Sequence, residues 1–264
     1  MHSRRSFSPW RLLIAAPRSG AENMARDTAL QARAARTGET VFSIYSWSRP
    51  TLSFGRNQPA TGLYDLGKIR AAGIDVVRRP TGGRAILHYR EITYSVTAPV
   101  KDALPLRETY SRINRILQTG LSRLGVVVEP VPRSLPTRTP GVRSCFETPG
   151  EGELVAHGSK LVGSAQWRDD GSLLQHGSIL VNDDQSALPS LAADAWSGGE
   201  TIAPATLHAL LGRSPDANEV ASAMFDAVRS LEDADAVELA EDDVREETLE
   251  HVPHFLDEDW TWRR

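Results

Sequence analysis

The stretch that decides the fold reads Arg78-Arg79-Pro80-Thr81-Gly82-Gly83-Arg84-Ala85-Ile86-Leu87-His88. It joins two segments that we expect to be strands, residues 75–79 and 85–98, and the second has apolar side chains at alternate positions. The adjacent glycines can adopt positive φ and let the backbone approach a ligand, while three arginines could hold an anion or an acyl-carrier group. A tight turn with solvated arginines is the alternative interpretation, and composition alone favours it.

Around this stretch, Gly, Pro and Ser break the chain into short segments that alternate between helical and strand-like periodicity. Strands are predicted from Trp10 and over 41–47, 51–54, 75–79, 85–98 and 126–131, and an antiparallel meander with a hairpin turn at Asp170-Gly171 over 154–181. Helices are predicted over 23–36, 66–72, 110–124, 201–211, 215–231 and 241–251. Ser214 is the expected N-cap of the helix over 215–231.

This order of elements predicts an α+β fold with mixed, largely antiparallel sheets flanked by helices. We expect residues 1–9 to be a flexible polar tail and residues 10–264 to be a single domain. Within it, the motif-bearing core covers about 38–232 and the C-terminal tail is helical. No internal repeat and no long linker divides the sequence.

Composition excludes several classes of protein. The 264 residues are 40% hydrophobic and 24% charged, as in ordinary globular proteins. No stretch approaches the roughly 18 consecutive apolar residues of a membrane span, so we predict no membrane association. The single cysteine, Cys145, cannot form an intramolecular disulfide, which is compatible with a reducing cytosol and leads us to expect a cytoplasmic protein.

Charge is spread unevenly along the chain. Residues 1–101 hold 16 Lys or Arg against 6 Asp or Glu, whereas residues 232–259 hold 13 Asp or Glu against Arg245 alone. The basic front could steer an acidic partner. Because the sequence has no basic run and no nucleic-acid motif, we predict no nucleic-acid binding and favour an acidic carrier protein. The acidic segment is most simply a solvated helix face.

Two side chains could carry chemistry. Cys145 lies in a polar, Pro-rich loop, where a nearby cation would favour the reactive thiolate. Lys160 is one of only three lysines against 27 arginines, which suggests that a compact ammonium is needed there. The alternatives are an inert core cysteine and a lysine retained by chance.

Histidines offer further candidates. His88 and His176 could act as acid or base groups, although either could equally be a satisfied structural histidine. His251 and His254 have a spacing seen in metal sites, but Pro253 lies between them and no other ligand is near, so we predict no metal site.

Six motifs in order resemble the lipoate and octanoate transfer branch of the biotin and lipoate protein ligase superfamily. The resemblance covers about residues 10–181, with a weaker match at Asp259-Trp260-Thr261. The motifs are Trp10-Arg11-Leu12-Leu13, Glu22-Asn23-Met24-Ala25, Ser53-Phe54-Gly55-Arg56-Asn57-Gln58, the Arg-Arg-Pro-Thr-Gly-Gly-Arg stretch, Gly158-Ser159-Lys160-Leu161-Val162-Gly163-Ser164-Ala165-Gln166 and Gln175-His176-Gly177-Ser178-Ile179-Leu180. The resemblance implies the catalytic-domain fold of that superfamily.

Within the superfamily the chain is most similar to octanoyltransferases of the LipM type, on account of Arg84 and of Ser-Cys-Phe-Glu-Thr-Pro upstream of the lysine. The resemblance implies that Cys145 is an acyl-thioester nucleophile and that Lys160 lowers its pKa and orients the acyl carbonyl. It also implies a set of substrate-binding residues: Arg79, Thr81, Gly82, Gly83, Arg84, His88, Gly163, Ser164, Ala165 and His176. Tyr89 departs from the aspartate usual in the family.

The resemblance further implies the reaction and its partners. The donor would be octanoyl-acyl carrier protein, and the acceptor a lipoyl domain or the glycine-cleavage H protein. Neither ATP nor another cofactor would be needed, because the donor is already a thioester. We expect a monomer. The alternatives are an ATP-dependent lipoate-protein ligase that forms an acyl-adenylate, and a non-catalytic protein that binds an acylated carrier.

Overall fold

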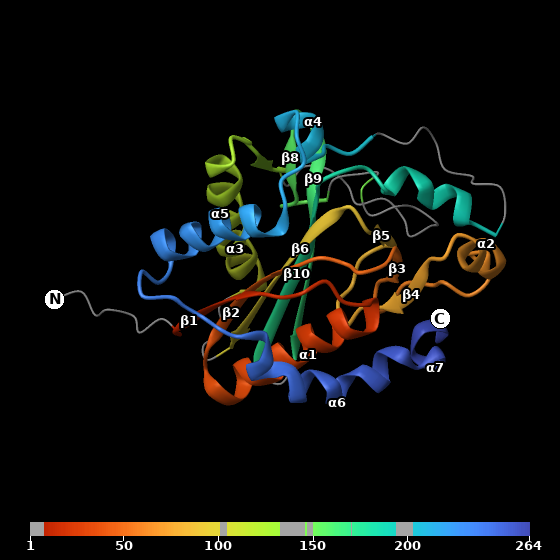
Figure 1. Cartoon of the computed structure of the whole chain (residues 1–264), viewed down its shortest axis with the longest axis horizontal. Helices are drawn as coiled ribbons and strands as arrows, with labels where there is room; N and C mark the ends of the chain where they lie inside the picture. The colour runs from red at the N-terminus through yellow and green to blue at the C-terminus, as the bar shows by residue number, and fades with distance from the viewer. Residues whose placement is uncertain (1–7, 101–104, 133–145, 147–149, 170, 194–202) are drawn as a thin grey trace.

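Two β-sheets form the centre of the computed structural model, which describes residues 8–100, 105–132, 146, 150–169, 171–193 and 203–264 (Figure 1). The larger sheet has the strand order β11-β1-β2-β6-β10-β9-β8-β7 and the smaller one β4-β3-β5. The larger comprises β11 (Val237–Glu238), β1 (Trp10–Ile14), β2 (Thr40–Tyr45), β6 (Glu91–Pro99), β10 (Ser172–Leu180), β9 (Ser159–Asp169), β8 (Leu154–Ala156) and β7 (Glu129–Pro130). The smaller comprises β4 (Asp75–Arg78), β3 (Thr51–Phe54) and β5 (Ile86–His88).

Most neighbouring strands are antiparallel. Parallel pairing is confined to β11-β1, β1-β2 and β4-β3 among the described strands. The predicted meander is present as β8, β9 and β10, and β10 pairs with β6 over its whole length. The α+β class with mixed, largely antiparallel sheets is therefore confirmed.

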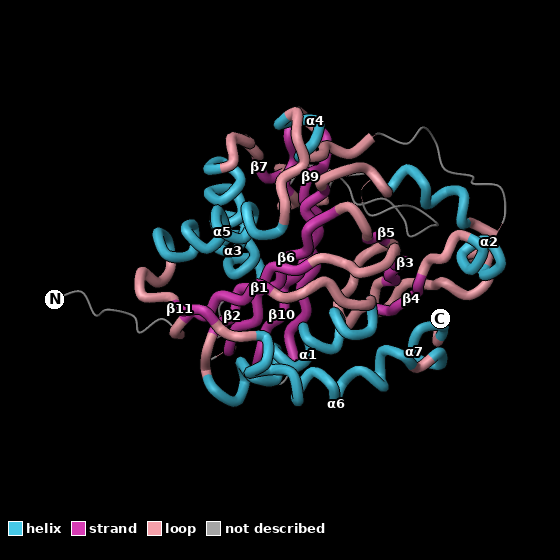
Figure 2. Tube along the Cα trace, in the orientation of Figure 1, coloured by secondary structure: helices cyan, strands magenta, loops and turns pink. Residues whose placement is uncertain are grey.

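Helices cover both faces of the larger sheet (Figure 2). They are α1 (Gly20–Thr37), α2 (Leu66–Ala71), α3 (Leu106–Arg123), η1 (Gln185–Leu191), α4 (Leu207–Leu211), α5 (Ala217–Leu231), η2 (Glu241–Val244), α6 (Arg245–Leu256) and α7 (Glu258–Trp262). Helices α3 and α5 pack together on one face, and α1 and α6 on the other. None of the helices in the described part of the chain is long and apolar enough to span a membrane.

The sheet divides the apolar interior because successive strand residues face opposite sides. Phe42 and Ile44 of β2 join the core beneath α3 and α5, whereas Val41 and Tyr45 join the core beneath α1. A third core, built on Leu52 and neighbouring residues, lies between the smaller sheet and η1. The site described below lies where α1, β6, β10 and the smaller sheet meet.

Several predicted elements differ from those observed. The strand predicted over 85–98 is two strands, β5 and β6, which belong to different sheets and are separated by Tyr89 and Arg90. The prediction of Ser214 as N-cap was wrong: Asp216 caps α5, and its carboxylate accepts a hydrogen bond from the Glu219 backbone N–H. The helix predicted over 201–211 is helical only from Leu207 within its described part.

Helix α1 starts three residues before the predicted boundary because Ser19 and Glu22 form a capping box. The Ser19 hydroxyl accepts from the Glu22 backbone, and the Glu22 carboxylate accepts from the Ser19 backbone at 3.1 Å. The hydrogen bond between the Ser19 hydroxyl and the Glu22 carboxylate also lowers the pKa of Glu22. The helix ends at Gly38 in the left-handed conformation, as the glycine predicts.

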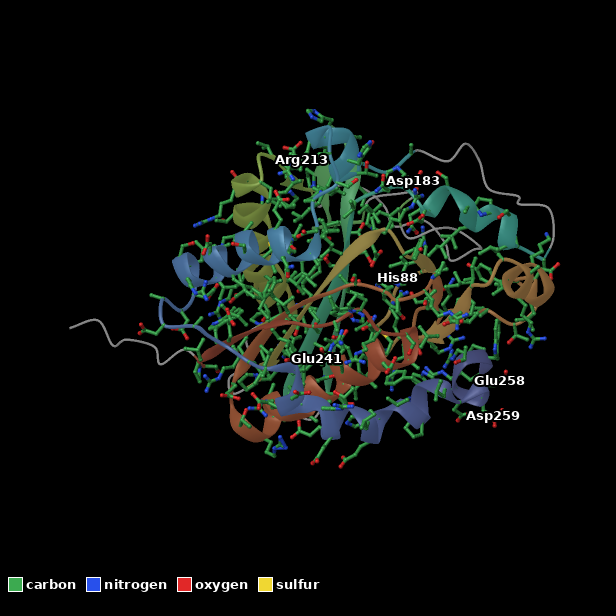
Figure 3. The ribbon with its side chains drawn as sticks, viewed as in Figure 1. His88, Asp183, Arg213, Glu241, Glu258 and Asp259 are labelled. Atoms are coloured by element: carbon green, nitrogen blue, oxygen red, sulfur yellow. The ribbon has the colours of Figure 1, made fainter. Side chains whose placement is uncertain are left out.

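The acidic segment is more than a solvated helix face. Glu241, labelled in Figure 3, forms ion pairs with Arg18 at 3.4 Å and with the buried Arg26 at 3.3 Å. Glu247 of α6 pairs with Arg36 of α1. The acidic C-terminal segment thus neutralises part of the basic front on which it packs.

Candidate active site

A pocket lies between the glycine stretch and strands β9 and β10. Among the predicted site residues, those that line it are Arg79, Gly83, His88, Gly163, Ser164, Ala165 and His176. They come from four separate segments, so the fold brings together residues that are up to 97 positions apart in sequence.

Lys160 reaches the wall of this pocket from β9. Its side chain is fully buried, and Nζ donates to Glu153 Oε1 at 2.5 Å. The ammonium also lies 4.7 Å from the centre of the Phe146 ring, a cation–π contact. Glu153 lines the pocket, so the ion pair fixes a positive and a negative group at its edge.

Gly163 makes room for this lysine. A Cβ at position 163 would lie 2.9 Å from Lys160 Cε and 3.1 Å from both Lys160 Nζ and Phe146 Cζ. Contacts this short do not occur without displacement of one partner. A side chain at position 163 would therefore force the end of the Lys160 side chain away from its observed path across β9.

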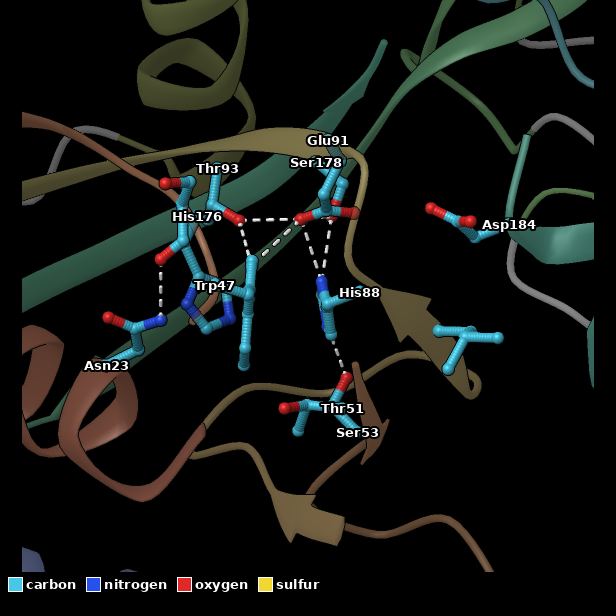
Figure 4. Close-up of polar contacts among 12 residues, drawn as sticks. Asn23, Trp47, Thr51, Ser53, His88, Glu91, Thr93, His176, Ser178 and Asp184 are labelled. Atoms are coloured by element: carbon cyan, nitrogen blue, oxygen red, sulfur yellow. Dashed lines mark hydrogen bonds and ion pairs between the residues drawn. The ribbon is translucent and has the colours of Figure 1, made fainter. Parts of the chain in front are cut away.

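His88 is held in a buried network at one wall (Figure 4). Its Nδ1 lies 2.8 Å from Glu91 Oε1, and its Nε2 lies 2.6 Å from Ser53 Oγ. The Trp47 ring stacks on the imidazole with the ring centres 4.0 Å apart. Glu91 Oε1 also accepts from Trp47 Nε1 at 3.2 Å and from the hydroxyls of Thr93 at 2.6 Å and Ser178 at 2.9 Å.

These contacts fix the charges of the pair. Burial lowers the pKa of His88 and outweighs the raising effect of Glu91. Burial alone would raise the pKa of Glu91, but the proximity of His88 and hydrogen bonds from His88, Thr93 and Ser178 hold it below its usual value. Because Glu91 Oε1 accepts several hydrogen bonds, we assign a carboxylate at Glu91 and a neutral His88 that donates through Nδ1.

His176 is held in a second network of the same form. Nδ1 lies 2.7 Å from Asp27 Oδ2, and Nε2 lies 2.7 Å from Thr81 Oγ1. The same Asp27 oxygen accepts from the Tyr45 hydroxyl at 2.8 Å. Burial and the nearby Asp27 raise the pKa of Tyr45 well above its usual value, so this hydroxyl stays protonated and donates.

The arginines of the glycine stretch bind the protein's own backbone. Arg79 donates to the carbonyls of Ser53 at 3.0 Å, Gly82 at 3.2 Å and Arg84 at 2.9 Å. Gly83 adopts φ +105°, a conformation that glycine tolerates best. Through these contacts Arg79 shapes the loop that lines the pocket, and the expectation that the arginines jointly hold an anion stays a prediction.

The remaining predicted residues lie around the pocket. Thr81 does not line the pocket, but its hydroxyl contacts the pocket-lining His176. A Cβ at Gly82 would have no heavy atom within 4 Å, and the Arg84 side chain is half-buried. Cys145 lies outside the described residues, although Phe146, directly after it, is buried among Ile86 and Leu180.

Sequence reasoning missed the buried partners of the predicted residues: Asp27, Trp47, Ser53, Glu91 and Glu153. One signal was available for Asp27. It follows Asn23 at helical spacing, and both lie on the face of α1 that is buried against the sheet. The other partners are distant in sequence from the groups that they hold, or lie in strands without a distinctive pattern.

Comparison with known proteins places this site in context. Residues 19–229 match the family described as the lipoyl protein ligase A/B catalytic domain. The chain is 40% identical to the octanoyltransferase LipM of Carboxydothermus hydrogenoformans over 183 residues, which cover 68% of this chain and 67% of that protein. It is 35% identical to the octanoyltransferase LipM of an Exiguobacterium species, with 97% and 98% of the two chains covered.

Solved structures give the same fold. The structure of an archaeal lipoylation system from Thermoplasma acidophilum, with a bi-partite lipoate protein ligase and its E2 lipoyl domain, superposes with a TM-score of 0.77. The match covers 97% of this chain and 96% of that one at 19% sequence identity, which supports the shared fold alone. The predicted catalytic-domain fold is confirmed.

Proposed function

Because the chain belongs to the lipoyl protein ligase A/B catalytic-domain family and is an acyltransferase with LipM octanoyltransferase relatives, we propose that it transfers octanoyl from acyl carrier protein to a lipoyl-carrier lysine. The proposed intermediate is a thioester on Cys145, and the proposed acceptor is the glycine-cleavage H protein. The reaction needs no nucleotide, since the donor thioester is already activated.

The observation that carries this proposal is the position of Phe146. Its ring contacts Lys160 and packs on Ile86, which lines the pocket. Cys145 directly precedes Phe146 in the sequence, and this adjacency supports the proposal that its thiol acts beside Lys160.

Both half-reactions balance without a further reactant. The Cys145 thiolate attacks the carbonyl carbon of the carrier thioester, a new C–S bond forms, and the carrier thiolate leaves and is protonated. The acceptor amine then attacks the acyl-enzyme, a C–N bond forms, and the Cys145 thiolate is released while the amine loses a proton. The first exchange is nearly isoenergetic, and the amide makes the second favourable.

Lys160 supplies the fixed positive charge for this chemistry. An adjacent cation favours thiolate over thiol and would also stabilise negative charge on the acyl oxygen. The ion pair with Glu153 fits a lysine that acts through its charge.

The pocket suits an apolar chain. His88 and His176 each have both ring nitrogens in hydrogen bonds, and the carboxylates behind them accept from the protein. Met24, Trp47 and Ile86 supply apolar lining. Burial of the octanoyl chain contributes about 0.8 kcal/mol per CH₂.

Intact-mass analysis tests the proposal directly. After incubation with octanoyl-acyl carrier protein, the wild type should gain one octanoyl group that hydroxylamine removes. Cys145→Ala should gain none and should lose transfer to the acceptor. Full transfer by Cys145→Ala or Cys145→Ser would sink the proposal.

Two further measurements separate the competing functions. Lipoate-dependent exchange of pyrophosphate into ATP, unaffected by Cys145→Ala, would indicate an ATP-dependent lipoate ligase. Tight binding of the acylated carrier, with neither an adduct nor turnover, would indicate a binding protein.

A further inference from the structure

Three arginines beside the glycine stretch form no ion pair with an Asp or Glu side chain among the described residues. The structure pairs many of its described arginines with acids within 4.0 Å, but Arg56, Arg263 and Arg264 are in none of these ion pairs. The Arg263 guanidinium lies 3.9 Å from the centre of the Trp260 ring, and that of Arg56 lies 5.6 Å from it. Aromatic stacking thus holds the two charges close together without neutralising them.

This cluster adjoins the glycine stretch and β9. The Arg56 backbone N–H donates to the Thr81 carbonyl at 2.7 Å. Its guanidinium also lies 4.3 Å from the centre of the Trp167 ring. Trp167 follows Ala165 by two positions on β9, so it faces the same side as this pocket-lining residue, roughly 7 Å further along the strand. Arg56 therefore contacts both the glycine stretch and β9, two segments that contribute residues to the pocket lining.

The positive charge of each arginine also affects the pKa of its neighbours. Burial together with Arg56 and Arg264 lowers the pKa of Arg263. Beneath them, burial and the charges of Arg263, Arg264 and Arg79 lower the pKa of Arg78 to about 10. The Nη2 of this fully buried Arg78 has no hydrogen-bond partner in the described structure. None of the ion pairs in the described part of the chain joins Glu258 or Asp259, both labelled in Figure 3, to this cluster.

We infer that Arg56, Arg263 and Arg264 form the docking surface for the acidic carrier protein that presents the octanoyl thioester. This inference rests on the proposed function. Stacked and exposed guanidiniums can bind several carboxylates of an acidic protein surface at once. Their place beside the two segments that line the pocket would set the carrier close to the site that its acyl chain enters, which favours the donor as occupant. Charge complementarity of this kind mainly raises the association rate.

Charge reversal at the exposed positions tests this. Arg263→Glu and Arg264→Glu should each raise the KM for octanoyl-acyl carrier protein by about fivefold at low salt, and the difference from wild type should shrink as salt increases. Arg115→Glu, an exposed position on α3 across the molecule, is the matched control and should leave this KM unchanged. Acyl-enzyme formation is measured in single turnover, without acceptor.

A small donor separates docking from chemistry. With an octanoyl thioester of free pantetheine, both variants should acylate Cys145 at the wild-type rate. Unchanged KM for the carrier, or an equal loss with the small thioester, would overturn the inference. A defect confined to transfer from preformed acyl-enzyme would assign the surface to the acceptor instead. If the wild type forms no acyl-enzyme from octanoyl-acyl carrier protein itself, the proposed function fails and not the docking surface.

Discussion

At the residue scale, two histidines with buried carboxylate partners define the pocket walls. The sequence predicted His88 and His176 as candidates but could not supply Glu91, Asp27 or Ser53, because tertiary packing alone brings these side chains together. The observed geometry favours the structural interpretation for His88, whose ring nitrogens are both occupied. A polar pair of this kind organises the cavity and would leave the proposed acyl chain an uncharged imidazole to pack on.

His88 gives the protein a defined response to acid. Its folded-state pKa is below the ordinary value of 6.5, so the unfolded chain binds the proton more readily. The free energy of unfolding should therefore fall as pH decreases below about 6.5. The lowered pKa of Glu91 adds a further loss below its ordinary value of 4.5. His88→Gln should flatten the decrease between pH 7 and 5 in urea unfolding, whereas exposed His208→Gln should not. Equal slopes for His88→Gln and wild type would contradict the assignment of a neutral His88.

At the element scale, the ends of helices and strands were predictable where a residue such as glycine or proline marks them in the sequence. The strand over Thr51–Phe54 has its predicted bounds, and the left-handed glycine Gly38 ends α1 close to the expected position. The division of residues 85–98 between two sheets was not predictable, because alternation of apolar residues does not say which neighbour a strand pairs with. Sheet membership is decided by contacts that are distant in sequence.

Strand β9 offers an element-scale prediction. Gly163→Ala should displace the Lys160 side chain, because the added Cβ would lie 2.9 Å from its Cε. Acyl-enzyme formation should fall by about tenfold or more, as expected when a reacting group is misplaced. Gly82→Ala is the control, since a Cβ there meets nothing within 4 Å, and it should fold as stably as wild type. Normal acylation by Gly163→Ala would show that Lys160 does not act from its observed position.

At the scale of the whole molecule, the C-terminal segment holds the glycine stretch in place. Arg78 donates to the carbonyl of Thr261 at 2.9 Å, of Gly55 at 2.7 Å and of Gln58 at 2.8 Å. The indole N–H of Trp260 donates to the Arg78 carbonyl at 2.9 Å. The sequence showed the uneven charge along the chain but not that its two ends pack together.

Loss of this link should weaken the entire fold. Arg78→Met removes hydrogen bonds from a buried charged group, so the free energy of unfolding in urea should fall by about 3 kcal/mol or more. Arg78→Lys should not restore it, because an ammonium cannot span the same carbonyls. Exposed Arg70→Met on α2 should change stability by less than about 0.5 kcal/mol. A loss of that small size for Arg78→Met would refute a structural role for the link.

The long reach of Arg78 also has a consequence for synthesis. Its partner Thr261 follows 183 residues later, and β1 pairs with β11 near the other end of the chain. A nascent polypeptide emerges from its N-terminus, so neither contact can form until the late residues have left the ribosome. The glycine stretch therefore stays without its final support during most of translation, and the pocket reaches its working shape only after the last helices are made.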